Sequence, residues 1–149
     1  MRVLIQRVAS ASVVVDEKVT GAIDHGLLLL VGITHADTEA IEDRMADKIV
    51  KLRIFSDAQG LMNQCVIDVG GGLLAVSQFT LYADAKKGNR PSYTNAARPE
   101  QASPAFERLV AKLALRIGKT VPTGVFGADM KVMLVNNGPV TIWLDSETL

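Results

Sequence analysis

The residues best suited to chemistry form a polar cluster directly after an apolar run. Residues 73–76 are Leu-Leu-Ala-Val, and the cluster that follows is Ser77-Gln78-Phe79-Thr80-Leu81. The apolar run is typical of a strand, so the cluster would lie at a strand end, where backbone N–H groups can hold an oxyanion. The Thr80 hydroxyl would act as a nucleophile or as a hydrogen-bond donor. Because no base is evident beside it, we favour the donor role. The alternative is a strand that simply runs into a loop.

A second unusual segment lies near the C-terminus, between two apolar, strand-like runs. Its sequence is Asn136-Asn137-Gly138-Pro139-Val140-Thr141. Proline has no backbone N–H and glycine has no Cβ, so another molecule can approach this backbone closely. The segment is therefore either a turn between two strands or a rigid probe whose carbonyls and amides contact a ligand. Taken alone, its residues favour the turn.

Other common catalytic devices are missing from the sequence. His25 and His35 belong to no serine elbow and no HExxH motif. The single Cys65 cannot form an internal disulfide, and with two distant histidines it offers no zinc-ligand spacing. The glycines at 70–72 are followed by neither Lys-Ser/Thr nor a helix, so they do not form a phosphate-binding loop. We therefore expect neither a metal nor a cofactor.

Positive charge is concentrated in the polar segment 82–98, which has one acidic residue, Asp84. Its basic residues are Lys86, Lys87, Arg90 and Arg98. A loop of this length inside a compact domain is usually functional. The formal net charge of the chain is zero, so no global field points to nucleic acid, but a local patch can still hold phosphates. The alternative is a solvated loop that happens to be basic.

Composition indicates one globular domain, residues 1–149, in which 48% of residues are hydrophobic and 21% are charged. The first residues lack the apolar core of a signal peptide. The longest apolar run, residues 27–31, is far too short to span a bilayer. We expect a cytoplasmic protein without a membrane partner.

Strand-like segments outnumber helical ones. Strands are expected at residues 3–8, 12–15, 19–23, 27–31, 66–69, 73–81, 121–125, 130–135 and 140–144. One helix is expected from a cap at Asp37 or Thr38 to residues 52–55, and another from Ser103, with Pro104 first, to Gly118. Strands and helices do not alternate throughout. The pattern predicts an α+β domain with a mostly antiparallel, barrel-like sheet and two main helices packed on it.

Residues 77–81 and 136–141 together resemble the signature of the D-aminoacyl-tRNA deacylase family. The similarity extends over the whole chain. Three further segments are in family form: Met1-Arg2-Val3-Leu4-Ile5-Gln6-Arg7-Val8, Lys87-Gly88-Asn89-Arg90-Pro91-Ser92 and Phe126-Gly127-Ala128-Asp129-Met130.

The resemblance implies a homodimer with a barrel-like fold. It implies hydrolysis of the ester that joins a D-amino acid, or glycine, to the 3′-terminal adenosine of a tRNA, and it implies no DNA partner. In the family, a cis Gly-Pro segment reaches into the pocket of the partner subunit, where its carbonyls exclude L-amino acids. In this sequence that probe corresponds to Gly138 and Pro139, and Arg7 helps to orient it.

The resemblance also assigns the pocket itself. Its floor corresponds to residues 77–81, with Ser77 and Leu81 beside the substrate. Gln78, Phe79 and Thr80 are the expected catalytic residues, and the amides of Phe79 and Thr80 are candidates for holding the oxyanion. Phe126 and Met130 correspond to the adenosine side. The acceptor end of the tRNA would contact Lys86, Lys87, Arg90 and Arg98.

Two other functions stay open on the residues themselves. A non-catalytic RNA- or nucleotide-binding module would fit the missing triad and the basic segment. An esterase acting on small molecules would use Thr80 as its nucleophile. Turnover of D-tyrosyl-tRNA separates the deacylase from the binding module, and trapping of an acyl-threonine would identify the esterase.

Overall fold

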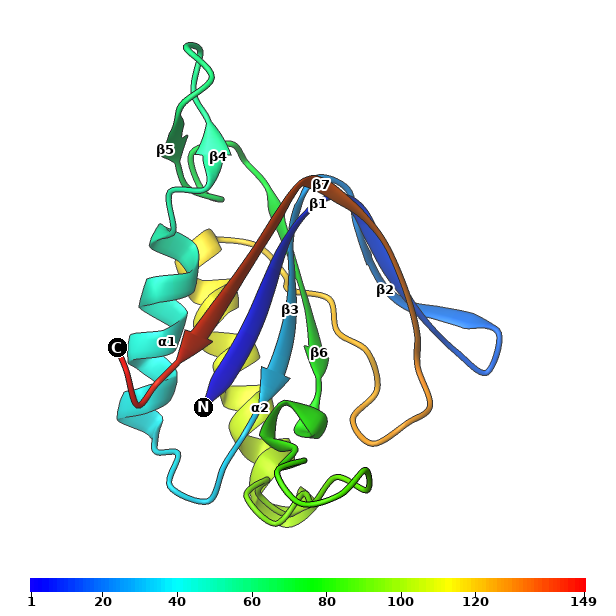
Figure 1. The fold of residues 1–149 in the computed structure, drawn as a ribbon. Helices are drawn as coiled ribbons and strands as arrows, with labels where there is room; N and C mark the ends of the chain where they lie inside the picture. Colours follow the sequence, from blue (N-terminus) through cyan, green and yellow to red (C-terminus); the bar gives the residue numbers. More distant parts are fainter.

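The computed structural model describes residues 1–149 as an α+β fold, with two helices on one side of a curled sheet (Figure 1). The helices are α1 (Glu39–Lys51) and α2 (Pro99–Ile117), and a short 3₁₀ helix, η1, spans Phe79–Tyr82. The strands are β1 (Arg2–Val15), β2 (Lys18–Ile23), β3 (Gly26–Gly32), β4 (Phe55–Ser56), β5 (Met62–Gln64), β6 (Gly72–Ser77) and β7 (Lys131–Asp145).

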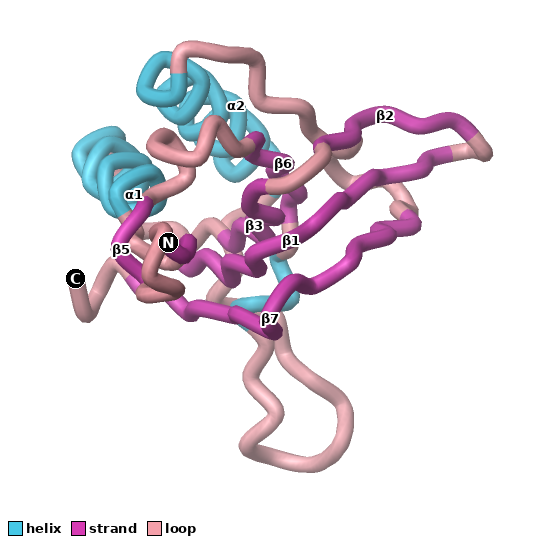
Figure 2. Tube along the Cα trace, turned by 90° about the horizontal axis from the view of Figure 1, so that it is seen from above, coloured by secondary structure: helices cyan, strands magenta, loops and turns pink.

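The main sheet is mixed and forms half a barrel (Figure 2). Strand β1 is antiparallel to β2, β3 and β7, whereas β6 is parallel to β3. We predicted a mostly antiparallel, barrel-like sheet. The structure differs at one edge, where β6 pairs with β3 in parallel. The cause is the long connection from β3 to β6, which includes α1, because parallel neighbours need such a crossover.

Residues 136–141 lie within the continuous strand β7, so the predicted turn between two strands does not form. Val8 of β1 pairs with Asn136, and Gln6 pairs with Thr141. Residues 137–140 therefore stand opposite the single residue Arg7, and they bulge out of a strand that does not reverse. Hydrophobic periodicity cannot distinguish such a bulge from a hairpin turn, because apolar strand-like runs flank both.

Three other predicted strands differ in the structure. Residues 66–69 form a turn, and residues 121–125 contribute only one bridge, from Thr123 to Ala75. The strand predicted over 73–81 ends at Ser77, where the chain enters η1. Conversely, the runs predicted at 3–8 and 12–15 form the single strand β1.

Three of the four predicted helix ends are confirmed. The Thr38 side chain caps α1, Leu52 follows its last turn, and Gly118 ends α2 in the left-handed conformation. The predicted start at Ser103 is wrong, because α2 begins at Pro99. The buried stripe of α2 extends upstream to Ala102, so packing outweighs the hydrogen bond that Pro104 cannot donate.

The core lies between the sheet and the helix pair. The β3 residues Leu27, Leu28 and Leu29 are fully buried, as expected for a strand covered on both faces. Neither helix has the length and apolar character needed to cross a membrane.

Candidate functional site

A hollow of about 490 Å³ lies at the end of β6, and it brings together five of the predicted site residues. These are Ser77, Gln78 and Phe79 from the β6–η1 junction, and Phe126 and Met130 from the segment before β7. The two groups are far apart in the sequence. Sequence reasoning missed the rest of the wall, which includes Tyr93, Ala96, Ala97, Pro99 and Ala102.

The junction between β6 and η1 presents unused hydrogen-bonding groups. The backbone N–H of Gln78 continues the sheet by donating to the Val31 carbonyl at 2.8 Å. The chain then tightens into η1, whose first N–H groups, on Phe79 and Thr80, have no partner within the helix. Gln78 Nε2 donates to Thr80 Oγ1 at 2.5 Å. Since this contact occupies a lone pair of the hydroxyl, its own hydrogen remains available for a ligand.

Arg2 holds the far end of η1 in place. Its Nη1 donates to the Leu81 carbonyl at 3.0 Å, and its guanidinium lies 4.4 Å from the ring centroid of Tyr82. Its Nε donates to Asp145 at 2.9 Å. Partial burial opposes ionisation of Asp145, but the Glu147 amide and the Arg2 guanidinium hold its pKa below the usual range. Burial raises the pKa of Tyr82, so its phenol stays neutral.

The wall of the hollow carries no charged side chain. Its polar side chains are those of Ser77, Gln78 and Tyr93, and Tyr93 is the only titratable one. The arrangement therefore has no general base and no metal ligands of its own. What it offers is an apolar pocket with a few hydrogen-bonding groups at one end.

Gly138 and Pro139 lie outside this hollow, in the β7 bulge, and both are exposed. Their peptide bond is cis. Arg7 lies directly opposite and donates from Nε to the Asn137 carbonyl at 2.9 Å and from Nη1 to the Ile54 carbonyl at 2.6 Å. Arg7 therefore fixes the carbonyl that precedes Gly138. The structure does not bring Arg7, Gly138 or Pro139 together with Ser77 in the same chain.

The predicted basic residues lie on the surface, and none of them lines the hollow. Asp84 and Ser92 exchange two backbone hydrogen bonds of 2.8 Å, which close residues 85–91 into a loop. Lys86, Lys87 and Arg90 are on this loop, and Arg98 immediately precedes α2. All four side chains are exposed. None of them forms an ion pair, because every ion pair in the structure joins other residues.

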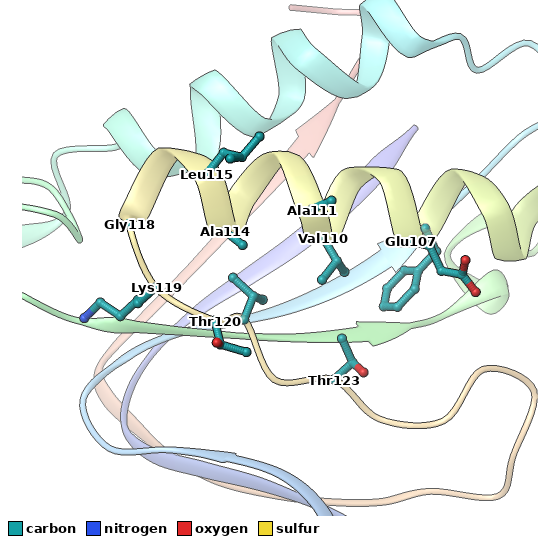
Figure 3. A pocket seen from close by; sticks show the side chains of 11 residues that line it. Glu107, Val110, Ala111, Ala114, Leu115, Gly118, Lys119, Thr120 and Thr123 are labelled. Carbon is teal, nitrogen blue, oxygen red and sulfur yellow. The ribbon is translucent and has the colours of Figure 1, made fainter.

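A second, more open hollow of about 840 Å³ lies between α2 and residues 118–123 (Figure 3). Val110 and Ala114 face that segment, and Leu115 points to the other side of the helix (Figure 3). Lys119 donates to the Gly70 carbonyl at 2.9 Å. None of the predicted site residues lines this hollow, and its wall pairs no nucleophile with a base.

The sequence model of the D-Tyr-tRNA(Tyr) deacylase family matches residues 4–145. The chain belongs to this family. It is 59% identical over 147 residues to the D-aminoacyl-tRNA deacylase of Dechloromonas aromatica, covering 99% of this chain and 98% of that protein. It is 60% identical over 146 residues to the D-aminoacyl-tRNA deacylase of Chromobacterium violaceum, covering 98% of this chain and 97% of that one.

Solved structures share the deacylase-family fold described above. The c-Myc DNA Unwinding Element Binding Protein superposes with a TM-score of 0.91 at 38% identity, covering 97% of this chain and 98% of that one. A probable eukaryotic D-amino acid tRNA deacylase superposes with a TM-score of 0.82 at 15% identity, covering 96% and 97%. The second similarity concerns the fold alone. Together they support the half-barrel with two helices as the architecture of this chain.

Proposed function

We propose that this protein hydrolyses the ester bond of D-aminoacyl-tRNA and releases the free D-amino acid and the tRNA. The observation that carries the proposal is near-full-length similarity to D-aminoacyl-tRNA deacylases in a chain whose hollow combines Ser77, Gln78 and Phe79 with Phe126 and Met130. In this assignment the aminoacyl group lies at the β6–η1 junction. The terminal adenosine lies against Phe126 and Met130.

An uncharged hollow fits this reaction. An aminoacyl ester is already activated, and the neighbouring ribose 2′-hydroxyl can assist attack by water. The protein then has to position the ester and stabilise the developing oxyanion. The free amides of Phe79 and Thr80 are the candidate oxyanion donors. The Thr80 hydroxyl, held by Gln78 Nε2, donates a hydrogen bond to the substrate and does not attack it.

Selection of the D-configuration is assigned to the β7 bulge of a second subunit. Gly138 and Pro139 are exposed, and Arg7 fixes the carbonyl before them, as a rigid backbone probe requires. Such a probe recognises the hand of the α-carbon while leaving the side chain free. It would reject L-amino acids by steric exclusion and accept D-amino acids and glycine.

The exposed surface of β7 supports the dimer. Strand β7 pairs only with β1, and Met133, Val135 and Trp143 are 53%, 58% and 47% exposed along it. An edge strand with large apolar side chains is a surface that natural proteins normally cover. A second copy of the chain would cover it and bring each bulge to the pocket of its partner.

The direct test measures release of D-tyrosine from D-tyrosyl-tRNA by the pure protein, with L-tyrosyl-tRNA and glycyl-tRNA in parallel. We expect release from the D-tyrosyl and glycyl substrates and none from the L-tyrosyl substrate. Binding of acceptor-stem RNA without any turnover would instead identify an RNA-binding module. An acyl-threonine trapped at Thr80 would identify an esterase with a covalent intermediate.

The cross-subunit arrangement has its own test. A charged substitution on the β7 edge, such as Val135→Glu, should produce a monomer that loses both activity and discrimination between D- and L-tyrosyl-tRNA. Sedimentation velocity measures the assembly. A monomer that remains active and selective would refute the cross-subunit probe while leaving the deacylase reaction intact.

A further inference from the structure

An aromatic pair stands at the rim of the candidate active site. Phe79 and Tyr93 pack edge to face, with ring centroids 5.0 Å apart and an interplanar angle of 70°. Both rings line the hollow, yet 57% of Phe79 and 40% of Tyr93 is exposed. The pair therefore does not belong to the core. It offers a preformed aromatic surface that faces solvent next to the pocket.

The backbone that carries Tyr93 is anchored on both sides. Ser92, just before it, exchanges two hydrogen bonds with Asp84. Just after it, the Thr94 carbonyl contacts His35 Nε2 at 3.1 Å, and the Asn95 carbonyl accepts from Thr34 Oγ1 at 2.7 Å. A ring held by such a backbone binds a flat partner without the entropic cost of ordering a loop.

Free positive charge lies on the loop that immediately precedes Tyr93 in the chain. The loop closed by Asp84 and Ser92 carries Lys86, Lys87 and Arg90, all exposed and without ion pairs. Tyr93 directly follows Ser92, the residue that closes this loop. An aromatic surface followed by unpaired cations is the arrangement by which proteins bind single-stranded nucleic acid, because bases stack on the rings and phosphates contact the cations.

The size of the hollow limits what it can hold. A pocket of about 490 Å³ accommodates a ligand the size of an aminoacyl-adenosine. A ligand of that size fills most of this volume, so a second nucleotide would lie at least partly outside it. The nucleotide on the 5′ side of the terminal adenosine must therefore leave the hollow across its rim.

We propose that Tyr93, with Phe79 packed edge to face against it, stacks on the base of the penultimate nucleotide of the single-stranded 3′ end, and that Lys86, Lys87 and Arg90 contact its phosphates. This inference rests on the proposed deacylase function and adds a second nucleotide subsite to it. Tyr93 thereby positions the RNA and takes no part in the bond that is broken. The subsite distinguishes an aminoacyl-RNA from an aminoacyl-nucleoside.

The test compares two substrates that differ only in the RNA, D-tyrosyl-tRNA and D-tyrosyl-adenosine. Tyr93→Ala should lower the ratio of kcat/KM for tRNA to kcat/KM for adenosine by about 5- to 150-fold, the range expected when one base no longer stacks. Tyr93→Phe retains the ring and should keep the wild-type ratio. Leu61→Ala, at an exposed apolar residue outside both hollows, is the matched surface control.

The basic loop is tested by the salt dependence of KM for tRNA. Replacing Lys86 or Lys87 with alanine should lower the slope of log KM against log salt by about 0.7 for each phosphate that the loop no longer neutralises. The slope for D-tyrosyl-adenosine should not change. Equal slopes for wild type and variants would remove the loop from the subsite.

Two results would overturn the inference: an unchanged ratio in Tyr93→Ala, including an equal loss on both substrates, or a lowered ratio that accompanies a changed oligomeric state. Failure of the deacylase assignment looks different, because the wild type would then hydrolyse neither substrate. In that case the readout is binding of a fluorescent single-stranded RNA ending in CCA. Tyr93→Ala should weaken it by the same factor, and unchanged binding would refute the subsite.

Discussion

Gly138→Ala is the substitution that most directly tests the β7 bulge. The φ angle of Gly138 is +140°, a conformation that residues with a side chain rarely adopt. A Cβ at this position would lie 2.8 Å from Val140 Cγ2, 2.9 Å from the Val140 amide nitrogen and 3.0 Å from Arg7 Nη2. The backbone and the guanidinium must therefore move, and both hold the probe in shape.

The size of the effect follows from these contacts. A non-glycine residue in a sparsely populated backbone region costs about 1–3 kcal/mol. If the chain relaxes instead, Arg7 loses its 2.9 Å hydrogen bond to the Asn137 carbonyl and the probe reorients. For a domain of this size the strain corresponds to a decrease of about 2–12 °C in Tm. The same energy, if it distorts the site, corresponds to about 5- to 150-fold in kcat/KM.

The assay measures hydrolysis of D- and L-tyrosyl-tRNA together with Tm. The matched control is Gly60→Ala, because Gly60 also has a positive φ, +80°, but a Cβ there would meet no atom within 4 Å. Gly60 lies in the turn between β4 and β5, so this variant should lose stability and keep its activity. A Gly138→Ala protein with wild-type turnover and wild-type selectivity would refute the assignment of the bulge as the chiral probe.

Three further substitutions test the fold and the mechanism. Glu42 is fully buried and accepts hydrogen bonds from Arg108, so Glu42→Gln should lower Tm by about 3–12 °C, and an unchanged Tm would contradict a stabilising role for its charge. Thr80→Ala should lose only about 2- to 13-fold in kcat/KM, the contribution of one neutral hydrogen bond, whereas complete loss would count against substrate-assisted hydrolysis. Because the pKa of Asp145 is lowered in the folded state, its contribution to stability is present above about pH 4 and disappears as pH falls through the lowered pKa. Thermal unfolding from neutral to acidic pH should show a shallower acid loss in Asp145→Asn, and identical profiles would refute that contribution.

Local sequence patterns were sufficient to predict the features that depend on neighbouring residues alone. Thr38 and Gly118 mark helix ends because capping is a local hydrogen-bonding or conformational requirement. The α+β class and the two helices were predicted for the same reason. The bulge at 137–140 was not, because it depends on the register between β7 and Arg7 of a strand far away in the sequence.

The candidate site likewise contains residues that the local sequence indicates and residues that it does not. Ser77, Gln78 and Phe79 stand out in sequence because polar residues end an apolar strand. Tyr93 gives no such signal, since it lies in a loop without periodicity. It reaches the hollow because the loop is tied to the end of β3, where the Ala97 amide donates to the Ile33 carbonyl at 2.9 Å. The position of Tyr93 in the site depends on long-range hydrogen bonds of this kind, which the sequence does not show.

Strand β1 connects the two segments on which the function depends. Arg2 donates to the Leu81 carbonyl in η1, and Arg7, five residues later, donates to the Asn137 carbonyl beside Gly138. Both arginines therefore hold a motif by its backbone, which is the part of the chain that the proposed mechanism uses. Because β1 pairs with three other strands of the sheet, its backbone is anchored by hydrogen bonds to each of them. A site that works through carbonyls and amides needs such a support, since backbone groups cannot reorient independently as side chains do.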